Sequence, residues 1–250
     1  MDRRDGILKV YKFGRLNINL FLWQVKVRLT ILFLLLIQLF KLEAQRSEAG
    51  IWLSLQMPVN FGKNWQWHND AGYRTEGVSV RPSQYLYRSG VRYRLNREYS
   101  VAAGIAGFFT RSLVPADEGE FGKEFRCWQE LNCSFERNQH FHWQLRGRIE
   151  QRFFAETISK GSTYSNRFRL RAGITSIINH FWSVQLADEW MDQQRSGKFA
   201  YDQNRVMLQF IKKGKDQSQW SAGYMWLKWT NESQQIIAVT YQKILNRNGR

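Results

Sequence analysis

The chain has 250 residues, a negative mean hydropathy and a formal net charge of +16. This length suits one domain, and the negative hydropathy excludes a polytopic helical membrane protein. Residues 1–45 contain eight Lys and Arg against three Asp and Glu, so the remainder keeps a net charge of +11. Such a charge favours an anionic surface or an anionic solute as partner, and the export signal described next argues against nucleic acid.

The first element is an apolar stretch at residues 29–40. It is shorter than a membrane-spanning helix, which needs roughly 20 residues, and fits a signal-peptide core, which needs about 7–15. Basic residues precede it, and Ala44 lies where a signal peptidase would cut. We expect a signal segment over residues 1–44, with translation starting near Val25, and a mature domain over residues 45–250. An N-terminal membrane anchor is the alternative.

From residue 51 onward, apolar and polar residues alternate with a period of two. In the clearest case, Phe141 and Trp143 share one face while His142 and Gln144 share the other. Successive side chains of a strand point to opposite faces, so the alternation predicts strands between two different environments. We predict eleven strands, at residues 51–57, 64–74, 84–95, 98–111, 122–136, 140–154, 165–177, 180–190, 202–213, 218–229 and 235–245.

The strands are long, and the connections alternate between short and long. A tilted transmembrane strand needs roughly 9–11 residues, whereas a typical soluble strand has about 5–6. Long loops are expected at 75–83, 112–121, 155–164 and 191–201, opposite short periplasmic turns. Aromatic residues near strand ends resemble the girdles of membrane barrels; these are Trp52, Trp65, Trp67, Tyr99, Trp182, Trp190, Trp226 and Trp229.

These features predict an all-β fold, a closed antiparallel transmembrane β-barrel of 10–12 strands, preceded by the signal segment. We expect a monomer in a bacterial outer membrane, in contact with outer-membrane lipid. Single-chain bacterial barrels are even-numbered, so we expect ten or twelve strands with both termini periplasmic. Strand 51–57 is then either outside the barrel or accompanied by a second short strand in 45–63. A soluble β-protein with its apolar face inside is the alternative.

Three segments carry a resemblance to a known family. They are the Trp-Leu-Ser-Leu strand at 52–55, the Asn-Asp-Ala-Gly-Tyr-Arg segment at 69–74 and the Tyr-Arg-Ser-Gly-Val-Arg-Tyr-Arg-Leu run at 87–95. Over about residues 50–245, the chain resembles the uncharacterised outer-membrane β-barrel family known as domain of unknown function 2490. The resemblance implies the barrel fold. It implies no reaction, because the family has none assigned.

If the apolar face meets lipid, the other face of the strands lines the lumen. We predict that the lumen-lining residues, as an anion path or a plug, are Arg88, Arg92, Arg94, Arg126, Glu130, Arg146, Arg148, Glu150, Arg152, Arg167, Arg169 and Arg171. Further acidic residues on this face are Asp70, Glu136 and Glu189. One reading is a structural barrel whose lumen is filled by salt bridges. The other is a narrow arginine-lined channel for small anions or acidic saccharides.

An outer-membrane hydrolase is a third possibility, because Ser134, Glu136 and His142 could form a Ser-His-acid set. No Gly-x-Ser-x-Gly motif, phosphate loop or metal-binding His pair accompanies them, so we expect no enzyme, no catalytic residue, no metal and no cofactor. Cys127 and Cys133 lie on the apolar face of one predicted strand, too far apart for a disulfide.

Overall fold

The computed structural model describes residues 48–112, 119–158 and 160–246. The expected signal segment and its cleavage position lie outside these residues. Within them there is no helix long and apolar enough to cross a membrane. The strands are β1 (Glu48–Gln56), β2 (Val59–Phe61), β3 (Trp65–Thr75), β4 (Pro82–Arg94), β5 (Tyr99–Arg111), β6 (Phe121–Asn138), β7 (Phe141–Phe154), β8 (Thr163–Ile177), β9 (Trp182–Arg195), β10 (Lys198–Lys213), β11 (Ser218–Lys228), β12 (Ser233–Lys243) and β13 (Leu245–Asn246).

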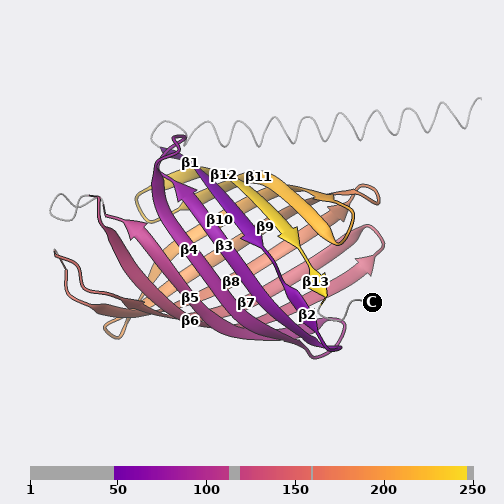
Figure 1. Cartoon of the computed structure of the whole chain (residues 1–250), viewed down its shortest axis with the longest axis horizontal. Coiled ribbons are helices and arrows are strands. Elements are labelled where there is room, and N and C mark those ends of the chain that lie inside the picture. Colours follow the sequence, from indigo (N-terminus) through magenta and orange to yellow (C-terminus); the bar gives the residue numbers. More distant parts are fainter. Residues whose placement is uncertain (1–47, 113–118, 159, 247–250) are drawn as a thin grey trace, which may run out of the picture. The chain divides into compact units, whose positions relative to one another are not determined.

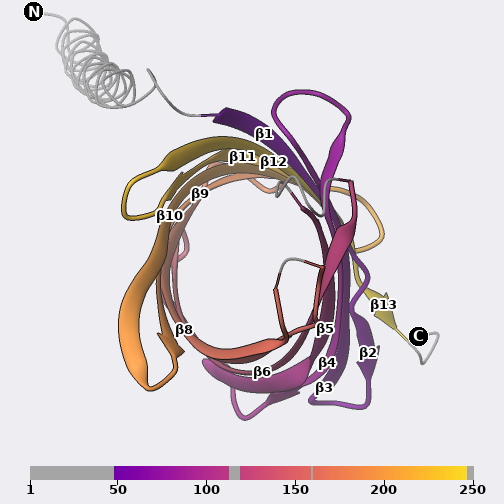
Figure 2. The same ribbon diagram turned by 90° about the vertical axis from the view of Figure 1, so that its left-hand side faces the viewer.

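The sheet closes into a barrel because β1 pairs with two strands that lie far apart in the sequence (Figure 2). β1 runs antiparallel to β3, with Leu53 opposite Tyr73, and parallel to β12, with Leu53 opposite Val239. From β3 to β12, each strand pairs antiparallel with the next. β2 follows β1 after Pro58, which has no N–H to donate, and β13 follows β12. The closed ring therefore has eleven strands.

Eleven strands fall within the predicted range, but the expectation of an even number is wrong. Residues 45–63 do contain a second short strand, and this strand, β2, extends β1 instead of adding to the ring. A ring of purely antiparallel neighbours must have an even count, whereas one parallel junction permits an odd count. The parallel junction also puts the start of β1 at the opposite end of the barrel from β13 (Figure 1). The expectation that both ends lie on one side is therefore wrong for the described barrel.

The two ends of the barrel differ in their connections. At the end that we call the short-turn end, the connections are residues 62–64, 95–98, 139–140, 178–181 and 214–217. The opposite end, which we call the long-loop end, has connections 76–81, 112–120, 155–162, 196–197 and 229–232. The long loop predicted at 191–201 is wrong, because β9 and β10 continue to a two-residue turn. Ser196 and Gly197 both have positive φ, 50° and 78°, as a type I′ hairpin turn requires.

The outer surface of the barrel is apolar, and charged groups are buried inside it. Ile105, Leu170 and Phe210 are 52%, 55% and 54% exposed, whereas Asp70 and Glu189 are only 1% and 2% exposed. This distribution of apolar and charged residues is the reverse of the one in soluble proteins, where charged residues are almost never fully buried unless paired. It is the pattern of a membrane barrel, with an apolar band outside and a polar interior.

Aromatic pairs mark both edges of the apolar band. Near the short-turn end, the ring centroids of Trp65 and Tyr93 are 4.6 Å apart, and those of Trp220 and Tyr241 are 4.7 Å apart. Near the long-loop end, Trp190 and Tyr201 are 4.8 Å apart. Two of the tryptophans expected in these girdles lie elsewhere, since Trp52 and Trp229 pack against a buried cluster of apolar side chains.

The interior also contains apolar side chains, in two clusters. Ala187, Met207, Met225, Leu227, Ile236 and Ala238 form a cluster on β9–β12. Leu86, Ala102, Ala106, Phe108 and Trp128 form a second cluster on β4–β6. The Trp128 ring fits because Gly90 and Gly104 have no side chains. A Cβ atom on either would lie 2.5 or 2.6 Å from Cζ2 of this ring.

Candidate functional site

A network of ion pairs crosses the barrel interior between β6 and β9. At its centre, Arg169 bridges two buried carboxylates. Its Nη1 atom donates to Oε1 of Glu150 at 2.6 Å, and its Nη2 atom donates to Oε2 of Glu189 at 2.9 Å. Arg126 also donates to Glu150, at 3.1 Å, and Arg146 also donates to Glu189. Each central carboxylate therefore serves more than one arginine.

The strand register explains this sharing. Arginines face arginines at several positions across neighbouring strands, for example Arg148 opposite Arg169 and Arg146 opposite Arg171. Like charges directly opposite one another destabilise a sheet. Glu130 on β6 lies opposite Arg148 on β7 and accepts a hydrogen bond from Nε of Arg148 at 2.7 Å. The carboxylates thus separate guanidinium groups that would otherwise repel.

The remaining predicted lumen residues join this network or lie beside it. Arg152 donates to Glu124 at 2.5 Å, and Arg92 lies 3.4 Å from Glu130. Arg88 pairs with Asp70, and Arg167 lies 2.8 Å from Asp202. Arg171 donates to the neutral Gln185 at 3.0 Å.

Arg94 is the exception among the predicted lumen residues. It is exposed at the last position of β4 and lines a separate cavity of about 390 Å³ beside the short turns. The structure therefore brings eleven of the twelve predicted residues together and leaves Arg94 apart.

Sequence reasoning missed four charged residues of the interior, Arg74, Glu124, Asp202 and Arg205. The period of two was enough to find Glu124, which lies two positions before Arg126, and Arg74, which lies four after Asp70. Asp202 was hidden by a register shift in β10 between Tyr201 and Gln203. Such a bulge breaks the alternation on which the prediction rested.

Arg74 and Arg205 contact the same aromatic ring. The Cζ atom of Arg74 lies 3.6 Å from the centroid of Trp52, and the Cζ atom of Arg205 lies 5.2 Å from it. Arg74 donates to the neutral Gln84 at 2.6 Å. The carboxylate nearest to Arg205 is Glu189, at 3.9 Å. These two guanidinium groups are therefore held by an aromatic ring more than by carboxylates.

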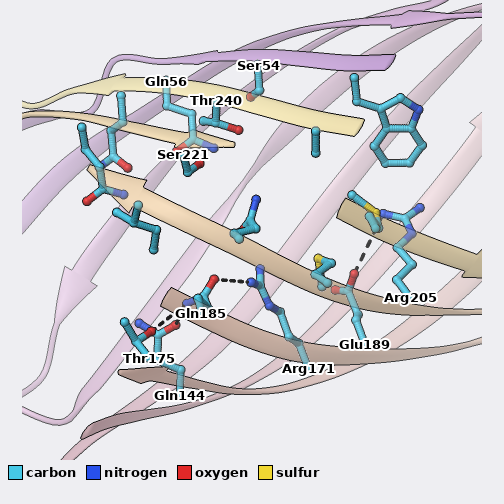
Figure 3. A pocket seen from close by; sticks show the side chains of 18 of the residues that line it. Ser54, Gln56, Gln144, Arg171, Thr175, Gln185, Glu189, Arg205, Ser221 and Thr240 are labelled. Carbon is cyan, nitrogen blue, oxygen red and sulfur yellow. Dashed lines mark hydrogen bonds and ion pairs between the residues drawn. The ribbon is translucent and has the colours of Figure 1, made fainter. Parts of the chain in front are cut away.

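Two cavities within the barrel meet at this pair of arginines. The first, of about 480 Å³, lies toward the short-turn end and is lined by Gln144, Thr175 and Gln185 among others (Figure 3). The second, of about 410 Å³, lies toward the long-loop end and is lined by Arg126, Arg152 and Arg167 among others. Arg74 and Arg205 line both cavities. They therefore lie at the boundary between the two cavities.

The residues considered for hydrolysis do not form a catalytic set. Nδ1 of His142 lies 3.5 Å from Oε1 of Glu136, whose side chain is 75% exposed. In the described part of the chain, no hydrogen bond joins Ser134 to His142. A nucleophile and its base must come within hydrogen-bond reach. Cys127 and Cys133 are free thiols, and the described residues contain no group of three or more His, Cys, Asp or Glu that could hold a metal ion.

Comparison with known proteins gives a family and a weak structural likeness. The family whose model matches residues 49–235 is described as "Protein of unknown function (DUF2490)". No curated protein matches the chain. A solved structure described as the NanC porin in a rhombohedral crystal form is 12% identical, with a TM-score of 0.43. The match covers 69% of this chain and 78% of that one. A likeness this weak assigns no function.

Proposed function

Since the chain belongs to the DUF2490 family, whose description names no activity, we propose from the geometry of the interior that this barrel is a narrow anion channel of the outer membrane. The observation that carries the proposal is the meeting of two cavities at Arg74 and Arg205. A solute that moves from one cavity to the other meets these guanidinium groups. Rings of fixed positive charge favour anions over cations in a pore.

The charge balance of the interior supports this selectivity. The interior arginines outnumber the interior carboxylates, which are Asp70, Glu124, Glu130, Glu150, Glu189 and Asp202. Arg169 and Arg148 are held by carboxylates on two sides, which leaves Arg74 and Arg171 with neutral hydrogen-bond partners. Arginine keeps its charge at all physiological pH values, so this surplus does not titrate away.

The outer surface supports the proposed location. Every strand of the ring exposes large apolar side chains, and aromatic pairs lie near both ends. Soluble monomers rarely expose extended apolar surface. Closed barrels satisfy every backbone hydrogen bond without an exposed edge, as a strand-built membrane protein requires. Barrels of this kind lie in bacterial outer membranes with their short turns in the periplasm. The short-turn end is then the periplasmic end.

A second candidate is a structural barrel with a plugged lumen. Arg169, held between Glu150 and Glu189, favours this candidate because such a bridge resists displacement by a passing ion. The β4–β6 cluster also fills part of the interior with apolar side chains.

Planar-bilayer recording separates the two candidates. In a KCl gradient, we expect discrete current steps whose reversal potential shows preference for chloride. The double variant Arg74→Gln, Arg205→Gln should lose most of this preference. The control Arg81→Gln, which removes a charge from an exposed loop pair with Glu76, should keep it. A silent barrel that retains heat-modifiable gel mobility contradicts the channel and favours the plug.

Cell fractionation tests the location independently of conductance. We expect the protein in the outer-membrane fraction, with gel mobility that changes on heating. Recovery from the soluble periplasmic fraction would overturn the proposed location.

A further inference from the structure

The cavity near the short-turn end has a wall chemistry that a simple anion does not need. Its lining includes the amides of Gln144 and Gln185 and the hydroxyls of Thr175, Ser221 and Thr240, beside Arg171 and Arg205 (Figure 3). We propose that this cavity is a binding site for a sugar acid, a polyhydroxylated carboxylate of monosaccharide size. Its volume of about 480 Å³ lies within the roughly 300–1,000 Å³ typical of small-molecule sites.

Arg171 and Arg205 are the groups that recognise the carboxylate. Arg171 uses Nη2 to donate to Oε1 of Gln185, a neutral partner, and forms no ion pair within the described residues. Arg205 lies 3.9 Å from Glu189, a carboxylate that already accepts hydrogen bonds from other arginines, and its buried Nε atom has no partner in the described structure. Both guanidinium groups therefore retain donors, and a guanidinium binds a carboxylate in a bidentate manner.

Gln185 positions the groups that recognise hydroxyls. Its Nε2 atom donates to Oε1 of Gln144 and to Oγ1 of Thr175, at 3.1 Å each, while its Oε1 atom accepts from Arg171. These bonds fix the orientation of Gln185 and leave the amide N–H groups of Gln144 and the hydroxyl hydrogen of Thr175 for a ligand. An amide or a hydroxyl can both donate and accept hydrogen bonds, so each can bind a sugar hydroxyl as donor or as acceptor.

The opposite cavity has less of this chemistry. Its two lining amides are Gln84, which already accepts from Arg74 and donates to Thr110, and Gln203, which donates to Met191. Arg126, Arg152 and Arg167 line this cavity, and Glu124 already accepts hydrogen bonds from the first two. This cavity therefore attracts negative charge, but it has no comparable set of amides to hydrogen-bond the hydroxyls of a sugar. The asymmetry predicts that discrimination between a sugar acid and a simple anion resides at the short-turn end.

Isothermal titration of the purified, detergent-solubilised barrel tests the site with three probes. We expect D-glucuronate to bind at least about tenfold more tightly than D-glucose or acetate, because D-glucose lacks the carboxylate and acetate lacks the hydroxyls. Arg171→Gln should weaken D-glucuronate at least about tenfold by removing a charge-assisted hydrogen bond. Gln144→Ala should weaken D-glucuronate and leave acetate unchanged. The control Arg81→Gln should behave as the unmodified protein.

Equal binding of D-glucuronate and acetate would overturn the proposal. The same conclusion follows if Arg171→Gln keeps heat-modifiable mobility and full D-glucuronate affinity. Binding does not require passage, so this inference and the channel fail separately. A barrel silent in bilayers that still prefers D-glucuronate supports the site alone, whereas a conducting barrel without this preference supports the channel alone.

Discussion

The Cζ atom of Arg74 lies 3.6 Å from the centroid of the Trp52 ring. The same indole also attracts Arg205, from 5.2 Å. The face of an aromatic ring carries negative charge density. The neutral Trp52 side chain therefore holds two cations near each other, at the boundary between the two cavities. The position of these two arginines therefore depends on a residue without formal charge.

Replacing Trp52 should widen the interior at the boundary between the two cavities. In Trp52→Ala, Arg74 and Arg205 each lose a cation–π contact worth about 0.5–2 kcal/mol and become free to move apart. We expect a larger single-channel conductance with anion preference retained. Trp52→Phe keeps an aromatic face and should stay close to the unmodified protein. Unchanged conductance in a folded Trp52→Ala barrel would argue against this role.

Removing a central carboxylate should destabilise the barrel. In Glu150→Gln, Arg126 and Arg169 each lose a charged partner in the interior. Breaking a buried ion pair costs about 3–5 kcal/mol, whereas changes at exposed positions are usually within about 0.5 kcal/mol. Urea unfolding in detergent, followed by tryptophan fluorescence, should show a large loss for Glu150→Gln and almost none for the exposed Glu136→Gln. Equal midpoints for the two variants would contradict the network as described.

The close packing around Trp128 predicts that alanine is tolerated at one glycine and destabilises the barrel at another. In Gly104→Ala, the new Cβ would lie 2.2 Å from the carbonyl oxygen of Ser89 and 2.6 Å from Cζ2 of Trp128, so β4 or the ring must shift. Overpacking of this kind costs about 1–3 kcal/mol. Gly147 meets nothing within 4 Å, and Gly147→Ala should be tolerated. The two variants are compared by the fraction of folded, heat-modifiable protein at increasing urea. Equal tolerance would refute the close packing of Gly104 against β4 and Trp128.

A cross-link tests the parallel junction. With Cys127 and Cys133 replaced by alanine, Leu53→Cys and Val239→Cys should form a disulfide on mild oxidation, because these positions are directly opposite in β1 and β12. Cα atoms separated by more than about 7 Å cannot be bridged without backbone movement. The pair Leu53→Cys and Ile237→Cys, two residues out of register, should therefore stay reduced. A cross-link in the second pair alone would show a different closure.

Most of the fold was predictable because each strand separates two different environments. The predicted strand 140–154 and the observed β7 differ by one residue at the start. At 191–201 the prediction failed because Gln193 and Gln194 are both polar. Beyond the apolar band neither face contacts lipid, so the contrast on which the period depends disappears there. The strand count failed for another reason, since alternation within strands says nothing about how the first and last strands meet.

Alternation also predicted most of the arginines that face inward, although Arg74 and Arg205 were missed, but it did not predict their partners. Arg146 reaches Glu189, which is 43 residues away in the sequence, because β8 lies between β7 and β9 and long side chains span it. The pairing of Trp52 with Arg74 and Arg205 depends on the closure of β1 against β3 and β12. Neither relationship leaves a local signal in the sequence.

The two apolar clusters of the interior act as an electrical insulator. They cover the walls formed by β4–β6 and β9–β12, so they exclude water from part of the cross-section. In the proposed channel, field lines from the guanidinium groups are confined to the part of the cross-section that these clusters leave free, where low-dielectric walls concentrate them. A small number of arginines can thereby set a strong local potential, one that dissolved salt screens less than it screens charges on an open surface.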